Sequence, residues 1–541
     1  MTHEHANAAE CWKTILADAA GKAHLLATIE RFARTNTAPA PIVFGTSGWR
    51  GEIGTDYTFR NLGIVTTAVI EALRTGDGEF YRAMGVADFA EIQRRGAIIG
   101  HDNRFLGRDF AMEVAAQFQA AGIRTWYSGE TTTPEFSTCI EMLGAACSVN
   151  LTPSHNPANY AGFKFNPADG GPAGTEITSR FETIANRMMT GGAPPAVHPP
   201  AQPEMLDSTA WYLQYLQERK TVDLDAIRRF IADEDCIICI DHVHGSTRHR
   251  MKRILGESAK IVYLRENDDY LFGGIAPEPS EKNMAGVMAV LTGSAARYRV
   301  GAIMDPDGDR IRHADHTVQI PMNYFGAMAC HFLHVHKGFR GVVAKSVGTS
   351  NFVNAIAAKL GIPIRETKVG FKNFRPFMLR NAAERAITAF EESDGISAYN
   401  HTLEKDAMLG LLLAIEMVAR TGRNLGEYLS EIMQEFGAYY PDRSGISVDR
   451  SLAGPALLAK LASIGKKYPK GTKLKIGTSE REIADVITVD GTKLVFDDGS
   501  WLMIRPSGTE PKVRFYIEAR TEADKQAVFA AAETMTREAL A

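Results

Sequence analysis

Apolar and polar positions alternate along the chain in a way that predicts helices and strands in turn. Residues 8–34 carry apolar side chains at helical spacing and predict one or two leading helices. The other elements predicted in the first part of the chain are helices at 60–74 and 109–121 and strands at 97–100, 124–127 and 145–149. Strands separated by helices favour a parallel or mixed sheet with both faces covered.

The same alternation returns twice. Residues 191–203 hold five prolines and predict a linker after the first unit. The later predicted strands are 236–240, 259–264 and 300–304 in a second unit, and 341–345 and 387–390 in a third. The apolar run 407–415 is bounded by Asp406 and Glu416 and is shorter than the ~20 residues of a membrane span, so it predicts a buried helix.

Paired short strands dominate after Arg420. They are predicted at 473–476, 483–489, 493–496, 501–504 and 515–519, with a hairpin turn at 497–499. The predicted fold is therefore α/β, with three related α/β domains containing mixed sheets and a smaller α+β domain at the C-terminus. The predicted domain bounds are 1–200, 204–315, 316–425 and 426–541.

Composition narrows the class of protein. A chain of 541 residues is too long for one core, in agreement with several domains. The net charge of −4 offers no positive excess for nucleic acid or an anionic membrane, so neither is expected as a partner. Six scattered cysteines, and an N-terminus without the apolar core of a signal peptide, favour a reducing, cytoplasmic location.

A turn at the end of the strand 145–149 offers the first candidate for chemistry. Pro153 and Pro157 break regular structure there, so Ser154 is expected on a turn where its hydroxyl can meet a substrate. Taken alone, the pair Ser154-His155 is also typical of capping and turn residues. A glycine-rich loop at 44–51 contains Arg50, which suits a phosphate.

Three aspartates follow the strand 300–304 at alternate positions: Asp305, Asp307 and Asp309. Carboxylates this close repel one another unless a cation neutralises them. A calcium EF-hand loop fits poorly, because its twelfth position would be His316 instead of glutamate. Mg²⁺ with a phosphate oxygen fits better, and a solvated turn is the alternative.

Two further loops suit a sugar phosphate. Glu391 and Ser393 follow the strand 387–390 and offer acceptors for sugar hydroxyls, although a plain acidic loop explains them as well. Residues 505–511 place an arginine fork, two hydroxyls and a glycine between two predicted strands, which suits a phosphate dianion. Lys164, Lys345 and Lys372 are further cations near loop ends.

These loops, in this order, resemble the motifs of the α-D-phosphohexomutase superfamily, which contains the phosphoglucomutases and phosphomannomutases. The likeness extends from about Phe44 over nearly the whole chain. It is carried by the loop ending in Arg50, Thr-Pro-Ser-His-Asn-Pro, Asp-Pro-Asp-Gly-Asp-Arg, Glu-Glu-Ser-x-Gly and Arg-Pro-Ser-Gly-Thr-Glu-Pro. The lysine-bearing segment 367–372 resembles a sixth motif of the glucose-type members.

The resemblance implies four domains around a central cleft and a role for each motif. Ser154 would be the phosphoserine, with Asp305, Asp307 and Asp309 holding Mg²⁺ against it. Arg50, His155 and Lys164 would serve the reacting end, where Lys164 or His155 transfers a proton. The substrate-binding residues implied are Arg310, Lys345, Lys372, Glu391 and Ser393, with Arg505, Ser507, Gly508 and Thr509 at the non-reacting phosphate.

The implied reaction is a Mg²⁺-dependent exchange of phosphate between O1 and O6 of glucose through glucose 1,6-bisphosphate. A phosphomannomutase or a dual-specificity enzyme is the alternative, and a phosphoglucosamine mutase is a weaker one. The Glu-Glu-Ser form favours glucose, whereas Phe390 and Asp394 depart from the common pattern. An aspartyl phosphatase using Asp305 would leave Ser154 and Arg505 without a role, and a sugar-phosphate sensor would not need the hydroxyl of Ser154.

Overall fold

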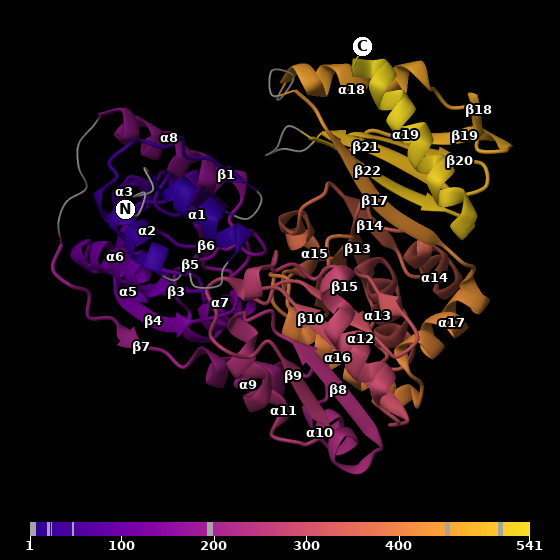
Figure 1. The fold of residues 1–541 in the computed structure, drawn as a ribbon, viewed down its shortest axis with the longest axis horizontal. Helices are drawn as coiled ribbons and strands as arrows, with labels where there is room; N and C mark the ends of the chain where they lie inside the picture. The colour runs from indigo at the N-terminus through magenta and orange to yellow at the C-terminus, as the bar shows by residue number, and fades with distance from the viewer. Residues whose placement is uncertain are drawn as a thin grey trace. The chain divides into compact units, whose positions relative to one another are not determined.

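A computed structural model describes residues 7–18, 22, 24–45, 48–191, 198–449, 455–506 and 512–540. The chain divides into two compact units. The first comprises residues 1–319, 378–380 and 395–425, and the second comprises residues 320–377, 381–394 and 426–541. Figure 1 labels most of the helices and strands of each unit.

The first unit contains a seven-stranded mixed sheet in the order β1-β2-β6-β5-β3-β4-β7. Its strands are β1 (Phe44–Gly45), β2 (Gly48–Glu52), β6 (Tyr160–Pro167), β5 (Cys147–Leu151), β3 (Ala97–His101), β4 (Thr125–Glu130) and β7 (Glu204–Met205). The strands β5, β3 and β4 run parallel, whereas β6 pairs antiparallel with β5 and β2 pairs antiparallel with β6. The carboxyl ends of β3 and β5 therefore lie at one edge, where both are followed by polar loops.

Helices cover both faces of this sheet because β3 alternates its side chains. Ile99 packs in the cluster that contains Phe110 and Phe118 of α6, and Ile98 packs on the other face with Phe136 of α7. The helices of this part are α1 (Ala8–Ala17), α2 (His24–Thr35), α3 (Phe59–Arg74), α4 (Gly78–Met84), α5 (Phe89–Arg95), α6 (Gly107–Ala120), α7 (Thr133–Leu143) and α8 (Thr175–Gly191).

A second sheet in the first unit has the order β12-β11-β10-β8-β9. Its strands are β8 (Cys236–Asp241), β9 (Ile261–Leu264), β10 (Tyr298–Met304), β11 (Ile311–Ala314) and β12 (Gln319–Ile320). Because Met304 pairs with Ile311 across β10 and β11, the residues between them form a tight hairpin. The accompanying elements are α9 (Ser208–Arg219), α10 (Leu224–Asp233), α11 (Arg250–Leu255), α12 (Ala285–Gly293), β16 (Gly395–Ala398) and α16 (Ala407–Thr421).

The second unit begins with parallel strands. β13 (Val342–Ser346) pairs with β14 (Ile364–Thr367) and with β15 (Ala386–Glu391), and the helices α13 (Met322–Val335) and α14 (Phe352–Leu360) accompany them. The same unit includes η4 (Phe371–Phe374) and α17 (Leu425–Phe436), although α17 begins at the unit boundary. The loops that follow β13 and β15 lie at one edge of this sheet, since parallel strands end on the same side.

The second unit ends in an antiparallel sheet in the order β17-β22-β21-β20-β19-β18 (Figure 1). Its strands are β17 (Tyr440–Ser447), β18 (Lys473–Ile476), β19 (Ser479–Ile487), β20 (Thr492–Phe496), β21 (Trp501–Pro506) and β22 (Lys512–Ala519). The helices α18 (Pro455–Lys467) and α19 (Lys525–Leu540) bury the apolar side chains of one face of this sheet.

The predicted α/β class is confirmed. The strand predicted at 145–149 lies two residues later, because the amide of Ala145 closes the end of α7 by bonding to Ile140. The run 407–415 is buried inside α16, as predicted. The predicted linker lies partly outside the described residues, and the domain bounds stay a prediction. No helix in the described part of the chain combines the length and hydropathy that a membrane crossing requires.

Candidate functional site

Ser154 lies on the turn that follows β5, fully buried at the edge of the first sheet. Its backbone is left-handed, with φ of 58°, and its amide donates to the hydroxyl of Thr152 at 2.9 Å. The Ser154 hydroxyl donates to Oδ2 of Asp305 at 2.8 Å. The ring nitrogen Nδ1 of His155 lies 3.4 Å from the same hydroxyl. The predicted nucleophile and the first predicted metal ligand therefore meet directly.

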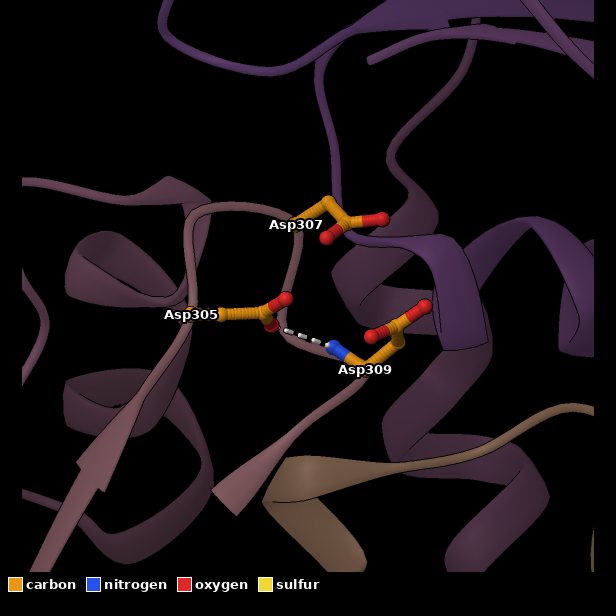
Figure 2. A group of neighbouring side chains, drawn as sticks. All are labelled: Asp305, Asp307 and Asp309. Atoms are coloured by element: carbon orange, nitrogen blue, oxygen red, sulfur yellow. Dashed lines mark hydrogen bonds between the residues drawn. The ribbon is translucent and has the colours of Figure 1, made fainter. Parts of the chain in front are cut away.

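The three aspartates share the hairpin between β10 and β11 (Figure 2). Oδ1 of Asp305 accepts the amides of Asp309 at 3.0 Å and Arg310 at 3.1 Å, so that one carboxylate orders the hairpin. Gly308 has φ of 66°, and a Cβ there would lie 2.8 Å from a methyl group of Thr247. Each aspartate offers an oxygen within 4.8 Å of the others.

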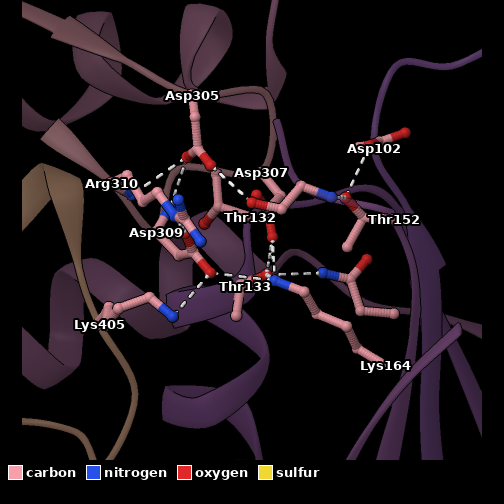
Figure 3. A network of polar contacts seen from close by, with 12 residues as sticks. Asp102, Thr132, Thr133, Thr152, Lys164, Asp305, Asp307, Asp309, Arg310 and Lys405 are labelled. Carbon is pink, nitrogen blue, oxygen red and sulfur yellow. Dashed lines mark hydrogen bonds and ion pairs between the residues drawn. The ribbon is translucent and has the colours of Figure 1, made fainter. Parts of the chain in front are cut away.

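Lysines balance much of the negative charge of this hairpin (Figure 3). The ammonium of Lys164, on β6, lies 2.6 Å from Asp307 Oδ2 and 3.0 Å from Asp309 Oδ2. Lys405 lies just before α16 and reaches Asp309 Oδ2 at 3.2 Å. Arg310 makes a longer contact of 3.6 Å with Asp309. Buried carboxylates and cations thus occur together, as buried charges must.

The pKa values reflect this pairing. Burial, together with Asp307 and Asp309, raises the pKa of Asp305 well above its usual value. Burial acts in the same direction on Asp309, but Lys164 and Lys405 outweigh it and hold the pKa of Asp309 well below its usual value. Arg310 and burial hold the pKa of His155 well below its usual value. The imidazole is therefore neutral near pH 7.

The aspartate hairpin fits a magnesium ion. Oδ1 of Asp307 and Oδ1 of Asp309 are buried without a hydrogen-bond donor among the described residues, although a buried carboxylate oxygen normally has one. Carboxylate and hydroxyl oxygens are the ligands that Mg²⁺ prefers, and it binds through few carboxylates while keeping open positions. The donor set of Asp305, Asp307, Asp309 and the neighbouring Ser154 matches that preference.

Arg50 lies on β2 and is tied to the serine loop. Its Nη1 donates to Oδ1 of Asn156 at 2.8 Å. Burial and the neighbouring Arg310 lower the pKa of Arg50 to about 10, which leaves the guanidinium charged at neutral pH. The structure thus brings together, in the first unit, the predicted residues Arg50, Ser154, His155, Lys164, Asp305, Asp307, Asp309 and Arg310.

In the second unit, Glu391 ends β15 and is buried. Its Oε1 accepts the amide of Gly370 at 2.7 Å, and Ser393 makes a long 3.5 Å contact with its Oε2. Because Gly370 precedes η4, which contains Lys372, this bond joins the predicted sugar loop to the predicted lysine loop. The two loops are therefore neighbours within one unit.

Arg505 lies next to the last residue of β21, and its Nε donates to Oδ2 of Asp490 at 2.9 Å, which orients the guanidinium. The same oxygen of Asp490 accepts the amide of Val369 at 3.0 Å. One carboxylate thus ties the arginine to the lysine loop, so that three predicted loops converge within the second unit. Ser507, Gly508 and Thr509 lie outside the described residues.

Lys345, on β13, is fully buried. Its ammonium donates to the carbonyls of Thr349 and Ser350, each at 3.1 Å, and to Oδ1 of Asn351 at 2.9 Å. It also lies 3.2 Å from Glu366. These contacts order the loop after β13, and a contact between Lys345 and substrate stays a prediction.

A second buried lysine predicts how stability depends on pH. Lys493 donates to the carbonyl of Val347 at 2.9 Å and lies 4.1 Å above the ring of Trp501. Burial and the nearby Lys345 lower the pKa of Lys493 to about 7. From pH 7 up to its ordinary pKa of about 10.4, the unfolded chain holds a proton on Lys493 that the folded chain has released. Raising the pH therefore stabilises the fold over this interval.

We expect the melting temperature of the wild type to rise relative to that of Lys493→Met between pH 6.5 and pH 9. Scanning calorimetry across this range measures the difference. Lys359→Met removes an exposed lysine of the same unit and serves as the matched control. The plot of its melting temperature against pH should run parallel to that of the wild type. Parallel curves for Lys493→Met would show that Lys493 keeps its proton in the folded chain.

Sequence reasoning missed Arg104 and Lys405 in the first unit and Asp490 in the second. Arg104 follows a predicted strand, so the strand-end argument used for Ser154 applied to it equally. No local pattern distinguishes Lys405 or Asp490, because their roles depend on partners distant in sequence.

Comparison with known proteins identifies the family of this chain. The phosphoglucomutase/phosphomannomutase alpha/beta/alpha domains I, II and III match residues 41–190, 210–318 and 321–436, and the C-terminal domain of that family matches residues 456–534. The chain is 25% identical to a phosphoglucomutase/phosphomannomutase of Thermococcus kodakarensis, over 82% of this chain and 91% of the relative. It is 26% identical to phosphoglucomutase 1 of Drosophila melanogaster, over 81% of this chain and 86% of the relative.

A crystal structure of similar fold comes from Thermus thermophilus, for a protein assigned as a phosphomannomutase. The two chains superpose with a TM-score of 0.74 at 26% identity, over 92% of this chain and all of the other. The four domain matches together account for most of the sequence, in the order expected of one enzyme. The chain belongs to the phosphoglucomutase/phosphomannomutase family and is an isomerase of the phosphohexomutase type.

Proposed function

We propose that this chain is a Mg²⁺-dependent phosphoglucomutase, which interconverts glucose 1-phosphate and glucose 6-phosphate through glucose 1,6-bisphosphate. The observation that carries the proposal is the 2.8 Å contact between the hydroxyl of Ser154 and Asp305, inside a buried aspartate hairpin faced by Lys164. A nucleophile, a metal-binding set and a cation are the components that phosphoryl transfer needs.

Ser154 carries the phosphoryl group in this proposal. The bond from phosphorus to Ser154 Oγ breaks while a bond to O6 of glucose 1-phosphate forms, and the proton of the O6 hydroxyl passes by way of His155 to Ser154 Oγ. The bisphosphate then turns over. The bond from phosphorus to O1 breaks as the phosphoryl group returns to Ser154 Oγ, and the proton of the Ser154 hydroxyl passes by way of His155 to O1. When bound, Mg²⁺ supplies positive charge beside the transferring group and polarises its oxygens.

The neighbouring side chains support the two charge states that this transfer needs. Burial acts to lower the pKa of Lys164, but Asp307 and Asp309 outweigh it and raise that pKa, so the ammonium stays charged. A charged ammonium at this position suits the neutralisation of negative charge on the transferring phosphoryl group. His155 is held neutral and lies 3.4 Å from the Ser154 hydroxyl, which suits a proton acceptor. The burial of Ser154 limits the access of water, which would otherwise hydrolyse the phosphoserine.

The second unit supplies substrate recognition in this proposal. Glu391 and Ser393 bind sugar hydroxyls, and Lys345 and Lys372 add positive charge; Arg310, which belongs to the first unit, is a further substrate-binding residue in this proposal. Arg505, Ser507, Gly508 and Thr509 bind the phosphate that does not react. One distant phosphate site can serve both orientations of the bisphosphate, so the two ends of the sugar can exchange. The proposed domains are 1–200, 204–315, 316–425 and 426–541.

The experiment that tests this function compares kcat/KM for the 1-phosphates of glucose, mannose and N-acetylglucosamine. Each assay contains Mg²⁺ and a trace of the matching 1,6-bisphosphate. We expect the highest value for glucose. A higher kcat/KM for mannose 1-phosphate would favour a phosphomannomutase, and equal values for glucose and mannose would favour a dual-specificity enzyme. A preference for N-acetylglucosamine 1-phosphate would favour a phosphoglucosamine mutase. Absence of isomerisation with all three would reject the proposal.

Release of inorganic phosphate distinguishes an aspartyl phosphatase from the proposed mutase. That enzyme would need a free oxygen on Asp305, yet Oδ1 of Asp305 accepts two backbone amides and Oδ2 accepts the hydroxyl of Ser154. These bonds lower the nucleophilicity of the carboxylate and favour a mutase. The phosphate released per isomerisation event should therefore be negligible.

Arg505→Ala tests the predicted site of the non-reacting phosphate. A charge-assisted contact is worth roughly 1.5–3 kcal/mol, so we expect KM for glucose 1-phosphate to rise about 10- to 100-fold. Steady-state kinetics measure the change. Arg537→Ala removes an exposed arginine of α19 in the same unit and is the control, for which KM should be unchanged. An unaltered KM in Arg505→Ala would place the phosphate elsewhere.

A further inference from the structure

Arg104 lies between β3 and α6, and its side chain is only 2% exposed. Its Nη2 donates to the carbonyls of Ser154 at 2.7 Å and Asn156 at 2.5 Å. Its Nη1 donates to the carbonyls of Pro157 at 2.5 Å and Tyr160 at 3.2 Å. A single guanidinium therefore binds four carbonyls of the turn that carries Ser154.

Asp102 closes a ring of hydrogen bonds that joins Arg104 to this turn, and Figure 3 shows its bond to Thr152. Its Oδ2 lies 3.1 Å from Nε of Arg104 and accepts the hydroxyl of Thr152 at 2.7 Å. That hydroxyl accepts the amide of Ser154 at 2.9 Å. The amide and the carbonyl of Ser154 are thus both held, one through Asp102 and Thr152 and the other by Arg104 directly.

These hydrogen bonds explain how Ser154 keeps its backbone conformation. A positive φ is unfavourable for a side chain larger than glycine and persists only where neighbouring bonds impose it. The conformation aims the hydroxyl of Ser154 at Asp305. The ring centre of Phe272 lies 4.8 Å from the guanidinium carbon of Arg104 and covers it, so water competes poorly for the four carbonyls.

We propose that Arg104 is a positioning residue for phosphoryl transfer, which holds Ser154 in the left-handed conformation that presents its hydroxyl to the aspartate hairpin. The inference rests on the proposed function, in which Ser154 carries the phosphoryl group. Lysine cannot replace Arg104, because an ammonium is a point charge and lacks the planar fork that reaches four carbonyls at once. Arg104 itself does not touch the substrate.

The test compares Arg104→Lys and Arg104→Met with the wild type in steady-state turnover of glucose 1-phosphate. A misplacement of about 1 Å costs roughly 100-fold in rate, so we expect kcat to fall about 10-fold in Arg104→Lys and about 100-fold in Arg104→Met. KM should stay within about threefold, because the groups that bind substrate are intact. Single-turnover phosphorylation of Ser154 by glucose 1,6-bisphosphate should slow by the same factors.

Hydrogen exchange gives a readout that does not depend on the enzyme's substrate. In Arg104→Lys we expect peptides that contain residues 152–160 to exchange at least tenfold faster than in the wild type, with other segments unchanged. Thr152→Val nearly conserves the volume of the side chain, removes the link to the Ser154 amide, and should give the same pattern. This variant and Arg104→Lys carry the test if Arg104→Met does not fold.

Arg95→Met is the matched control, because Arg95 also binds three carbonyls in the first unit but none in the serine turn. It should lower the melting temperature without changing kcat. The proposal is overturned if Arg104→Lys keeps the wild-type kcat and exchange rate, or if Arg95→Met loses kcat equally. A wild type that does not isomerise sugar phosphates refutes the proposed function instead, while faster exchange in Arg104→Lys would still establish that Arg104 orders the turn.

Discussion

Ser154→Ala should lower kcat for the isomerisation of glucose 1-phosphate by about 10⁴-fold or more, because it removes the only atom proposed to carry the phosphoryl group. The variant keeps the aspartate hairpin, Lys164 and the loops of the second unit. Binding of glucose 1-phosphate should therefore stay within a few-fold of the wild-type affinity. A coupled assay for glucose 6-phosphate measures the first quantity, and titration calorimetry measures the second.

Ser148→Ala is the control for this experiment. Ser148 is a buried serine on β5, the strand that leads to Ser154, and its hydroxyl has no hydrogen-bond partner within the described structure. Its removal should leave kcat unchanged. Mass spectrometry of the wild type treated with glucose 1,6-bisphosphate should also locate the phosphate on Ser154. Wild-type turnover in Ser154→Ala, or phosphate on another residue, would refute the assignment of the nucleophile.

Asp307→Asn should produce the second-largest loss. Asp307 has one buried oxygen without a donor in the described part of the chain, while its other oxygen accepts Lys164 at 2.6 Å and the hydroxyl of Thr133 at 2.5 Å. An amide is a weaker ligand for Mg²⁺ and leaves Lys164 with a single carboxylate partner at this hairpin. Loss of a group that orients a metal ion typically costs 10- to 100-fold, so we expect about 100-fold weaker activation by Mg²⁺.

Thermal stability provides an independent measure of metal binding. A ligand present at 100 times its dissociation constant stabilises the folded state by about 2.7 kcal/mol, so saturating Mg²⁺ should raise the melting temperature of the wild type. The same concentration should have little effect on Asp307→Asn. Asp315→Asn, which alters a buried aspartate bonded to the turn at Thr317, should retain the full Mg²⁺ response. An equal response in Asp307→Asn would exclude this hairpin as the metal site.

The substitutions at Ser154 and Asp307 should not be additive. Their side chains belong to one polar network. The Ser154 hydroxyl bonds to Asp305 of the aspartate hairpin, and Asp307 of the same hairpin contacts Lys164 (Figure 3). Where several residues act as one unit, the first substitution already removes most of their joint contribution to kcat, so a second substitution adds little. We therefore expect the double variant to be close in kcat to Ser154→Ala alone.

The sequence by itself determined the elements and the chemistry that is local. Prolines on both sides of Ser154 predict a turn, and the alternate spacing of Asp305, Asp307 and Asp309 brings three carboxylates together on any tight hairpin. The apolar runs before these loops predict the strands that end there. These features depend on neighbours within a few residues, and sequence patterns record such neighbours directly.

Only the tertiary structure decided which of these groups meet. The contact of Ser154 with Asp305 joins residues 151 positions apart, and that of Arg104 with Ser154 joins residues 50 apart. Lys345 and Lys405 both lie beside loops. The ammonium of Lys345 donates to backbone carbonyls, whereas that of Lys405 contacts Asp309. Such partners depend on how sheets and helices pack. Packing decides which residues distant in sequence come into contact, and the neighbours of a residue in the sequence do not reveal this.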